Sequence, residues 1–351
     1  MVRQRKGEHL KICLKHDVQS GIATGFSAYT LNPTALPEHD LHAIDLTTTF
    51  LGHTLKAPLL ISAMTGGSSL GARLNARFAQ AAQTYGIAMG VGSQRVALEH
   101  PELKETFSVV RTHAPRGVLF ANLGAVQLNY GRGIEDCIRC VEMIEAQALV
   151  LHFNALQEAL QPGGNTHFAG ILRKVTSLCR EFPVPVIAKE VGSGFSAQDA
   201  RRLVEAGVSA IDIAGAGGTS WSAVEMHRSP DTTVHKSFRS WGVPTARSLV
   251  TVRAAAPHIP LIVSGGIRSG HDIIKGLALG ASLAGMALPF LKAAALSETA
   301  LMRAVETLLT ELKTIMFCIG AANIAALVAT PCLSEDTTDP RTLTKNFYSG
   351  T

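Results

Sequence analysis

Eight short apolar segments alternate with helical patterns along this chain, and they constrain its fold more than any other feature. Continuous apolar runs of this kind are typical of strands buried on both faces of a parallel sheet. Eight strands that alternate with helices predict a TIM (β/α)8 barrel of the α/β class, with its active site at the carboxyl ends of the strands. The predicted strands are residues 58–62, 87–91, 117–121, 148–152, 184–188, 210–213, 260–264 and 282–286, and the clearest helices are 70–85, 134–145, 168–180, 197–206 and 246–256.

The last unit, from Pro260 to Leu291, carries a candidate phosphate site. Gly265 and Gly266 follow its first strand, and Gly285 lies near the end of its second. Glycine lets phosphate oxygens approach backbone N–H groups closely, and the N-terminus of the following helix attracts anions. Arg268 adds a positive charge. The pattern therefore favours phosphate binding over an ordinary βαβ unit with tight turns, which has similar punctuation.

Composition limits the classes of function. The chain has 351 residues, 46% of them hydrophobic and 17% charged, which favours a large core and further burial at subunit interfaces. A net charge of +5 suits an anionic small substrate, and two Trp and four Tyr give little basis for stacking on nucleic acid. Six cysteines without disulfide spacing predict a reducing cytoplasm. The Cys137–Cys140 pair lies in a helical pattern, which favours packed thiols over a redox or metal site.

The order of the segments predicts three regions. Residues 1–57 form an N-terminal extension with a basic helix and a hairpin that closes the barrel; 58–330 form the barrel; 331–351 form a tail. No signal peptide follows the charged N-terminus. Residues 314–334 lack formal charge, but Gly320, Asn323 and Pro331 interrupt them, so two helices are favoured over a membrane span. Residues 215–244 are a candidate lid.

The predicted strand ends carry neutral hydrogen-bonding groups around a single cation, Lys189. Ser93 and Asn122 follow two earlier strands, and glycines follow several others. Such a set suits a planar heterocycle with many polar edge atoms. A flavin fits, because a lysine can stabilise the negative charge of a reduced ring.

The chain resembles the type 2 isopentenyl-diphosphate isomerases, which are FMN-dependent (β/α)8 enzymes. The resemblance runs from Arg5 to about Leu327 and rests on RKGEHL, SAMTGG, GSQR, LHFNALQE, AKEVGSG, GAGGTSW, SGGIRSG and MFCIGAANI, in that order. SGGIR alone is common to many flavin barrels. The resemblance implies conversion of isopentenyl diphosphate to dimethylallyl diphosphate, with reduced FMN as acid and base, Mg2+ on the diphosphate, and NADPH only as a priming reductant. It also implies a homotetramer or homooctamer, with no nucleic acid or membrane partner.

The resemblance assigns roles residue by residue. FMN would be bound by Ala63, Met64, Thr65, Ser93, Asn122, Lys189, Thr219, Gly266, Ile267, Arg268, Ala284 and Gly285. The substrate would be bound by Arg5, Lys6, Ser93, Gln94, Arg95, Asn154 and Gln157, and Glu158 would be the Mg2+ ligand. Arg5 and Lys6 would reach the diphosphate from a closing N-terminal segment or a neighbouring subunit. Gln157, His152 and Lys189 are the candidate catalytic residues, with Gln157 orienting the substrate or relaying a proton.

Three other kinds of barrel are the alternatives to this function. A flavin-dependent hydroxy-acid oxidase would share the barrel and the phosphate turn, but it needs a His–Arg pair after the sixth strand, where this chain has AGAGGTSW. An IMP-dehydrogenase-like barrel would need a cysteine in the same loop, and none lies there. The non-enzyme alternative is an inert flavin-binding barrel.

Residues 321–327 lack the charged residues that often follow the MFCIGAANI motif in the family, which leaves their surface role open.

Overall fold

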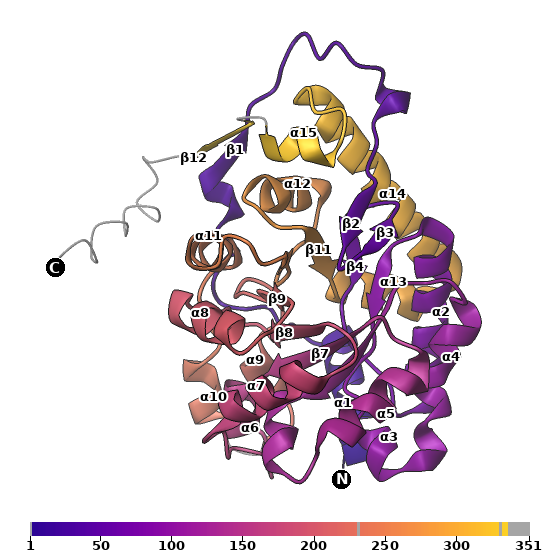
Figure 1. Ribbon diagram of the computed structural model, residues 1–351, viewed down its shortest axis with the longest axis vertical. Coiled ribbons are helices and arrows are strands. Elements are labelled where there is room, and N and C mark those ends of the chain that lie inside the picture. Colours follow the sequence, from indigo (N-terminus) through magenta and orange to yellow (C-terminus); the bar gives the residue numbers. More distant parts are fainter. Residues whose placement is uncertain (1, 230–231, 330–331, 336–351) are drawn as a thin grey trace, which may run out of the picture.

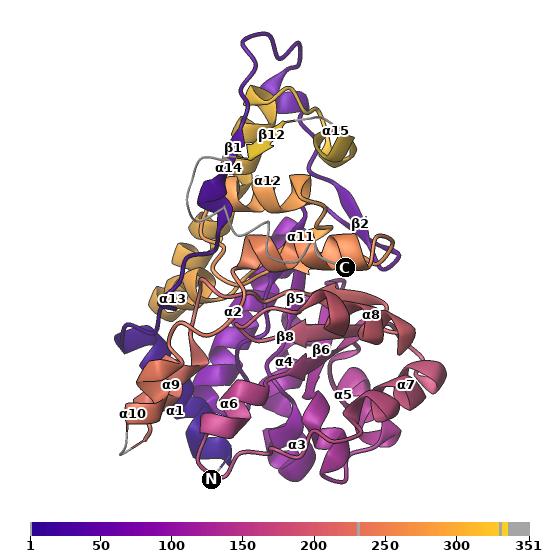
Figure 2. The same cartoon turned by 90° about the vertical axis from the view of Figure 1, so that its left-hand side faces the viewer.

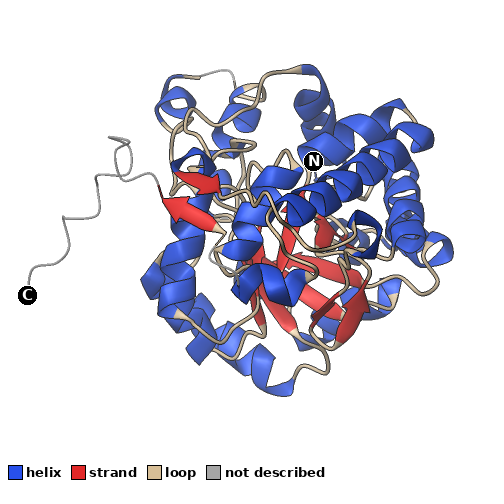
Figure 3. Ribbon diagram, turned by 90° about the horizontal axis from the view of Figure 1, so that it is seen from above, coloured by secondary structure: helices blue, strands red, loops and turns tan. Residues whose placement is uncertain are grey.

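The computed structural model describes residues 2–229, 232–329 and 332–335, and for residues 2–5 it describes the backbone alone. Eight parallel strands form a closed barrel in the order β10-β11-β4-β5-β6-β7-β8-β9. Seen from above, the strands gather at the centre and the helices surround them (Figure 3). The predicted TIM barrel is therefore confirmed. The strands are β4 (Leu59–Ile61), β5 (Ala88–Gly90), β6 (Leu119–Gly124), β7 (Ala148–Phe153), β8 (Val186–Glu190), β9 (Ala210–Asp212), β10 (Leu261–Val263) and β11 (Leu283–Met286).

Each predicted strand overlaps an observed one, and the largest difference lies in the middle of the barrel. β6 continues to Gly124, three residues beyond the predicted end, because its register with β7 extends to His152. The apolar run stops at Ala121, but the backbone of Asn122 still pairs with β7. Polarity therefore marks the point where a strand reaches the site, and it does not mark the point where pairing ends.

The barrel interior is divided into an apolar layer and a polar layer. Side chains alternate along a strand, so the residue two positions beyond an inward-facing one also faces inward. The apolar layer consists of Leu60, Ala88, Phe120, Ala148, Val150, Ile187, Ala210, Ile262 and Leu283, all of them buried. Two residues further along each of the eight strands lie the members of what we call the polar layer: Ser62, Gly90, Asn122, His152, Lys189, Asp212, Ser264 and Gly285.

A hairpin seals the amino-terminal end of this interior. Strands β2 (Thr48–Phe50) and β3 (His53–Leu55) pair antiparallel, and Phe50 and Leu55 join the apolar layer. The turn residues Leu51 and Gly52 have φ values of 48° and 81°, the left-handed pair that a tight two-residue hairpin needs. The predicted hairpin and its position under the barrel are therefore confirmed.

The helices cover the outside of the barrel, and most predicted helices match within two residues. The predicted helix at 168–180 instead begins at Ile171, because Gly170 before it is in the left-handed conformation. The described helices are α1 (Val2–Lys15), α2 (Ser69–Tyr85), α3 (Arg95–Glu99), α4 (Glu105–His113), α5 (Ile134–Ile144), α6 (Ala155–Leu160), α7 (Ile171–Glu181), α8 (Ala197–Glu205), α9 (Trp221–Met226), α10 (Thr233–Ser237), α11 (Thr245–Ala255), α12 (Gly270–Ala278), α13 (Leu288–Leu296), α14 (Glu298–Cys318) and α15 (Ile324–Ala329).

Cys137 and Cys140 are both fully buried on α5. Burial raises the pKa of the Cys137 thiol to about 12, and it raises the pKa of Cys140 further. Both side chains therefore stay as uncharged thiols, and the prediction of packed thiols is confirmed.

The uncharged segment at 314–334 forms the end of α14 and then α15, separated by Gly320 with a φ of 74°. Within the described ranges, no helix is both long enough and apolar enough to cross a membrane. After α15, β12 (Leu333–Glu335) pairs antiparallel with β1 (Tyr29–Leu31), so the start of the predicted tail is tied to the extension. The remainder of the tail, 336–351, lies outside the described residues.

The N-terminal helix and the lid helices lie together. α1 lies beside α9 in both side views, while α15, β1 and β12 lie at the opposite end of the molecule (Figures 1 and 2). The candidate lid after β9 forms α9 and α10, and residues 230–231 between them are outside the description. α1 of the extension therefore packs against the segment that follows β9.

Candidate active site

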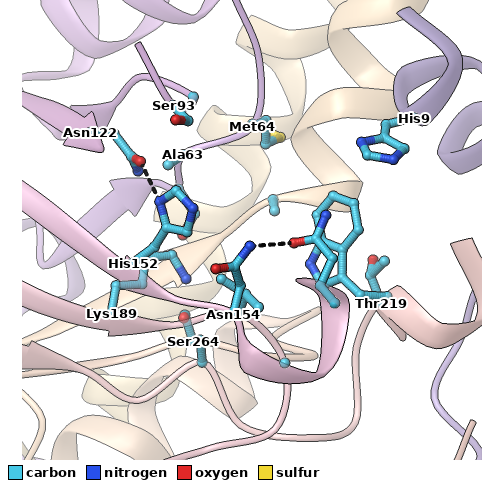
Figure 4. Close-up of a pocket in the computed structure, with 18 of the residues that line it drawn as sticks. His9, Ala63, Met64, Ser93, Asn122, His152, Asn154, Lys189, Thr219 and Ser264 are labelled. Carbon is cyan, nitrogen blue, oxygen red and sulfur yellow. Dashed lines mark hydrogen bonds between the residues drawn. The ribbon is translucent and has the colours of Figure 1, made fainter. Parts of the chain in front are cut away.

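A cavity of about 270 Å3 opens at the carboxyl ends of the barrel strands. The strand ends, α1 and the lid all contribute to its lining (Figure 4). It brings together most of the residues that the sequence singled out: Lys6, Ala63, Met64, Thr65, Ser93, Arg95, Asn122, His152, Asn154, Gln157, Glu158, Lys189, Thr219, Gly266, Ile267, Arg268 and Gly285.

Three predicted residues are not among the lining residues. Gln94 is fully buried, and its amide Nε2 donates to the carbonyl of Cys140 at 2.8 Å while its Oε1 accepts from the N–H of Asn122 at 2.9 Å. These two hydrogen bonds connect Asn122 on β6 with α5 on the outside of the barrel. Ala284 is also fully buried, one position before the lining residue Gly285. Arg5 lies within α1, and its side chain is outside the described part of the chain.

The turn after β10 fits a phosphate group. Gly265 and Gly266 have φ values of 98° and 82°, and a Cβ on Gly266 would lie 2.5 Å from the carbonyl oxygen of Gly217. The N–H groups of Gly265, Gly266 and Ile267 donate to no other described residue. Left-handed glycines with free amides form the concave, donor-rich surface that binds anions. The backbone here therefore fits the phosphate of FMN.

Two hydroxyl groups after β4 also lack a hydrogen-bond partner among the described residues. Ser62 Oγ and Thr65 Oγ1 are buried and make no hydrogen bond to other described residues. Buried polar atoms are normally paired, so unpaired ones in a cavity lining point to a ligand. A Cβ on Gly285 would lie 2.5 Å from Ser62 Oγ, so glycine keeps this space open. These donors and acceptors suit the polar edges of a flavin.

Lys189 places a positive charge in the polar layer. Its Nζ donates to the carbonyl of Glu190 at 2.8 Å and lies 3.4 Å from Oδ2 of Asp212. Asp212 is 2% exposed, and its Oδ1 accepts from Ser264 Oγ at 2.5 Å. The cation is thus held by a carbonyl and a buried carboxylate while its side chain still lines the cavity.

Beside this cation lies an uncharged His152 (Figure 4). Its Nδ1 is 2.8 Å from Oδ1 of Asn122, and because an amide oxygen accepts, Nδ1 carries the proton. Burial, together with the positive charges of Lys189 and Lys6, lowers the pKa of His152 to about 3. At neutral pH the imidazole is neutral, with Nε2 as a hydrogen-bond acceptor. It is therefore suited to positioning a substrate and has no proton to give from a charged form.

Glu158 is a buried carboxylate in a ring of amides. It is 6% exposed; Oε1 accepts from Asn154 at 3.1 Å, and Oε2 accepts from the Asn165 N–H at 2.6 Å and from Gln161 at 3.2 Å. Oδ1 of Asn154 is buried without a described hydrogen-bond partner. Within the described residues, no group of three or more His, Cys, Asp or Glu is arranged so that it could hold a metal ion by itself. Mg2+ accepts such a site, because it commonly uses one or two carboxylates with water and substrate phosphate oxygens.

Two cations lie where the lining passes from the strand ends to the helices. Lys6 of α1 contacts the Ser93 carbonyl, and its Nζ lies 4.9 Å from the centre of the Phe107 ring. Arg95, the first residue of α3, contacts Asn165 at 2.6 Å and Glu99 at 3.0 Å. Both lie in the lining with Glu158. The pair offers positive charge for an anionic group.

A buried ion pair attaches α1 to α9. Glu225 is fully buried, with Oε1 2.8 Å from His9 Nε2 and Oε2 2.6 Å from Arg228 Nη1. Arg228 Nε also lies 3.0 Å from Glu8 Oε2. Burial raises the pKa of Glu225, but the bonds from His9 and Arg228 outweigh it, so the pKa lies below its usual value. We call Glu8, His9, Glu225 and Arg228 the α1 latch.

Replacing Glu225 with alanine should release the α1 latch. Removing one partner of a buried ion pair costs about 3–5 kcal/mol, because the other charges stay buried without compensation. Since α1 carries Lys6, binding of an anionic substrate should weaken as well. Thermal unfolding and limited proteolysis of the N-terminal segment measure the two effects.

Asp17→Asn provides the control. Asp17, just after α1, also forms an ion pair with Arg239 of the candidate lid, but both side chains are largely exposed. Exposed pairs contribute little, so this variant should keep the wild-type melting temperature and proteolysis pattern. Equal losses in both variants would contradict a special role for the buried pair.

Comparisons with known proteins agree with this geometry. A family model described as FMN-dependent dehydrogenase matches residues 20–109 and 136–334. The isopentenyl-diphosphate delta-isomerase of Nostoc sp. is 52% identical over 329 residues, which cover 93% of this chain and 94% of that protein. The enzyme of that name from Methanoregula boonei is 50% identical, covering 91% and 90%.

This chain belongs to the isopentenyl-diphosphate delta-isomerase family. The resemblance inferred from the motifs is confirmed, and so is the prediction of an enzyme. The family match also supports FMN as the cofactor.

Solved structures with the same fold are more distant from this isomerase-family chain. A flavocytochrome b2 variant with sulfite bound has a TM-score of 0.68 at 18% identity, covering 93% of this chain and 82% of that one. A mutant of a chimera of (S)-mandelate dehydrogenase has a TM-score of 0.65 at 18% identity, covering 95% and 99%. At this identity the likeness establishes the barrel alone.

Several lining residues of this family member were not predicted. They include His9, Gln127, Gln161, Trp221 and Ser264. Asp212 was also missed, although it contacts Lys189 directly. Ser264 and Asp212 could have been found by counting two positions on from the apolar layer, as for Lys189. His9 could not, because its place depends on how α1 folds back over the barrel.

Proposed function

We propose that this enzyme moves the double bond of isopentenyl diphosphate to give dimethylallyl diphosphate. The observation that carries the proposal is the separation of charges in the cavity lining. Lys189 stands in the polar layer at the strand ends, while Lys6, Arg95 and Glu158 come from the helices beyond them. One region suits a flavin ring, and the other suits the diphosphate of a short substrate.

The chain's own groups fit FMN at both ends. Gly265, Gly266 and Ile267 would hold the phosphate through their free amides, with Arg268 alongside. Ser62, Thr65 and Asn122 would meet the polar edges of the ring, and Lys189 would stabilise its negative charge. When bound and reduced, FMN would supply the group that gives a proton to one substrate carbon and takes one from another.

The side chains of the lining support this division of labour. Glu158 is the single carboxylic acid among the described lining residues, and three hydrogen bonds hold it in place. His152 is neutral, and burial raises the pKa of the Cys13 thiol to about 11. Gln157, whose Oε1 accepts from Asn154 at 3.1 Å, has no titrating group and would orient the substrate. These side chains would therefore position the substrate, and bound, reduced FMN would supply the proton chemistry.

Charge neutralisation at the diphosphate would be shared. Lys6 and Arg95 would contact its oxygens, and Glu158 with the free Oδ1 of Asn154 would hold Mg2+ against them. Arg5, which directly precedes Lys6 on α1, is assigned to the same group. His152 would line the hydrocarbon end of the substrate.

The proposal includes the expectations that go with the family. NADPH would serve only to reduce FMN, the enzyme would work in the cytoplasm, and it would assemble as a homotetramer or homooctamer. The functional unit would be the barrel at 58–330, completed by the extension at 1–57, with the tail at 331–351 outside the chemistry.

The test is turnover under controlled flavin state. Purified protein is mixed anaerobically with FMN, MgCl2 and isopentenyl diphosphate, with and without NADPH or dithionite, and dimethylallyl diphosphate is assayed. Product should form in the reduced samples alone. Because the reaction involves no net redox change, each FMN should support many turnovers after a single reduction.

Two results would contradict the proposal. Equal turnover with oxidised FMN would remove the role of reduced flavin. Bound flavin without product in any sample would leave a flavin barrel of another activity, and 2-hydroxy acids with oxygen would then be tried. The segment from Gly215 to Trp221 offers neither His nor Arg for that chemistry.

A further inference from the structure

Behind Lys189 lies an ionic group that the proposed reaction does not use. Asp212 ends β9 and is register partner of Lys189 on β8. It is 2% exposed and is not among the residues that line the cavity. Its two oxygens are both engaged, one 3.4 Å from Lys189 Nζ and the other with Ser264 Oγ at 2.5 Å. Three adjacent strands thus form one polar chain: Lys189, Asp212, Ser264.

A carboxylate in this position is costly unless it is paired. Burial of an unpaired charge is strongly unfavourable, and a partner cation with a further hydrogen bond compensates for it. The ammonium of Lys189 has three N–H bonds. The Glu190 carbonyl and Asp212 account for two, which leaves one for a ligand in the cavity. Asp212 therefore fixes both the direction and the net charge of the group that faces the ligand.

We propose that Asp212 is a positioning residue that sets the redox potential of bound FMN through Lys189. The inference rests on the proposed function, because it takes the ring held by Lys189 to be FMN. A cation beside the ring stabilises the reduced form, which gains negative charge. The carboxylate behind that cation cancels part of its field, and it does so effectively because little water separates the two. Asp212 thus keeps the flavin harder to reduce than Lys189 alone would make it.

The experiment is the midpoint potential of FMN in the Asp212→Asn holoenzyme, measured by anaerobic dye equilibration. Asparagine keeps the shape and an acceptor for Ser264 but removes the charge. We expect the reduction equilibrium to shift about tenfold toward reduced FMN, which is about +30 mV for a two-electron couple. Asp212→Ser, which leaves room for water, should shift the potential in the same direction and provides the measurement if the first variant does not fold.

Two controls separate this effect from general loss of charge. Asp136→Asn also removes a buried acid, but one that pairs with Arg132 and Arg139 on the outside of the barrel, so the potential should not move. In a Lys189→Met background the effect of Asp212→Asn should disappear, since a buried carboxylate that has lost its cation takes up a proton and no longer carries the charge that the substitution removes. A shift that persists in that background would overturn the inference.

Failure of the inference and failure of the proposed function are distinguishable. Wild-type protein that does not bind FMN contradicts the proposed function before any potential is measured. Bound FMN with the wild-type potential in Asp212→Asn contradicts only the role of Asp212, and isomerase turnover then still stands on its own assay.

Discussion

Replacing Gly266 with alanine should abolish tight FMN binding. The residue has a φ of 82°, and a Cβ there would lie 2.5 Å from the Gly217 carbonyl oxygen, so both backbone segments would have to move. A left-handed non-glycine residue costs about 1–2 kcal/mol before any clash is counted. With the phosphate amides displaced as well, we expect about 100-fold weaker binding of FMN, measured by flavin fluorescence titration.

Gly131→Ala is the matched control. Gly131 has the same φ of 82°, but it is exposed, nothing lies within 4 Å of its Cβ position, and it is not among the residues that line the cavity. It carries the backbone strain without the crowding or the phosphate contact. FMN affinity in this variant should equal that of the wild type. Equal losses of FMN affinity in both variants would show that backbone strain alone, and not displacement of the phosphate-binding amides, controls FMN binding.

Replacing Glu158 with glutamine should cost about 100-fold or more in kcat/KM. The substitution keeps the shape but removes the carboxylate charge, and the Asn165 N–H at 2.6 Å would then face a weaker acceptor or an amide donor. Loss of a metal's stabilisation of phosphate charge is worth several kcal/mol, and about 3 kcal/mol corresponds to this factor. Rates measured across a Mg2+ titration should show a higher Mg2+ requirement.

Glu142→Gln serves as the comparison, because Glu142 is an exposed glutamate on α5. It should show the wild-type rate and the wild-type Mg2+ curve. If Glu158→Gln lost activity yet kept an unchanged Mg2+ curve, the carboxylate would be organising the amides around it and would not be the metal ligand.

The barrel and the phosphate turn could be predicted from the sequence because both have local signals. An apolar run marks each strand, and paired glycines mark the turn at Gly265. Lys189 could be found too, as a charge at the end of an apolar run. What these residues touch could not be read in this way. Gln94 follows a strand end like Ser93 beside it, yet its amide turns into the core and contacts α5.

The contacts of α1 were also beyond the sequence. His9 and Glu225 are more than two hundred positions apart, and neither has a local pattern that distinguishes it from a solvated helix charge. Their pairing depends on how the extension folds back across the barrel. Non-local contacts of this kind follow from the assembled fold and have no period or motif of their own.

The two-layer interior of the barrel has a consequence for how such proteins diverge. The apolar layer and the hairpin beneath it hold the strands together, while the positions two residues further along face the ligand. Exchanges at Asn122, His152 or Lys189 therefore leave the packing beneath them intact. A change of reaction needs only a handful of compatible replacements at one level of the barrel. The flavocytochrome b2 variant keeps the same fold at 18% identity, so the barrel itself tolerates replacement of most of its residues.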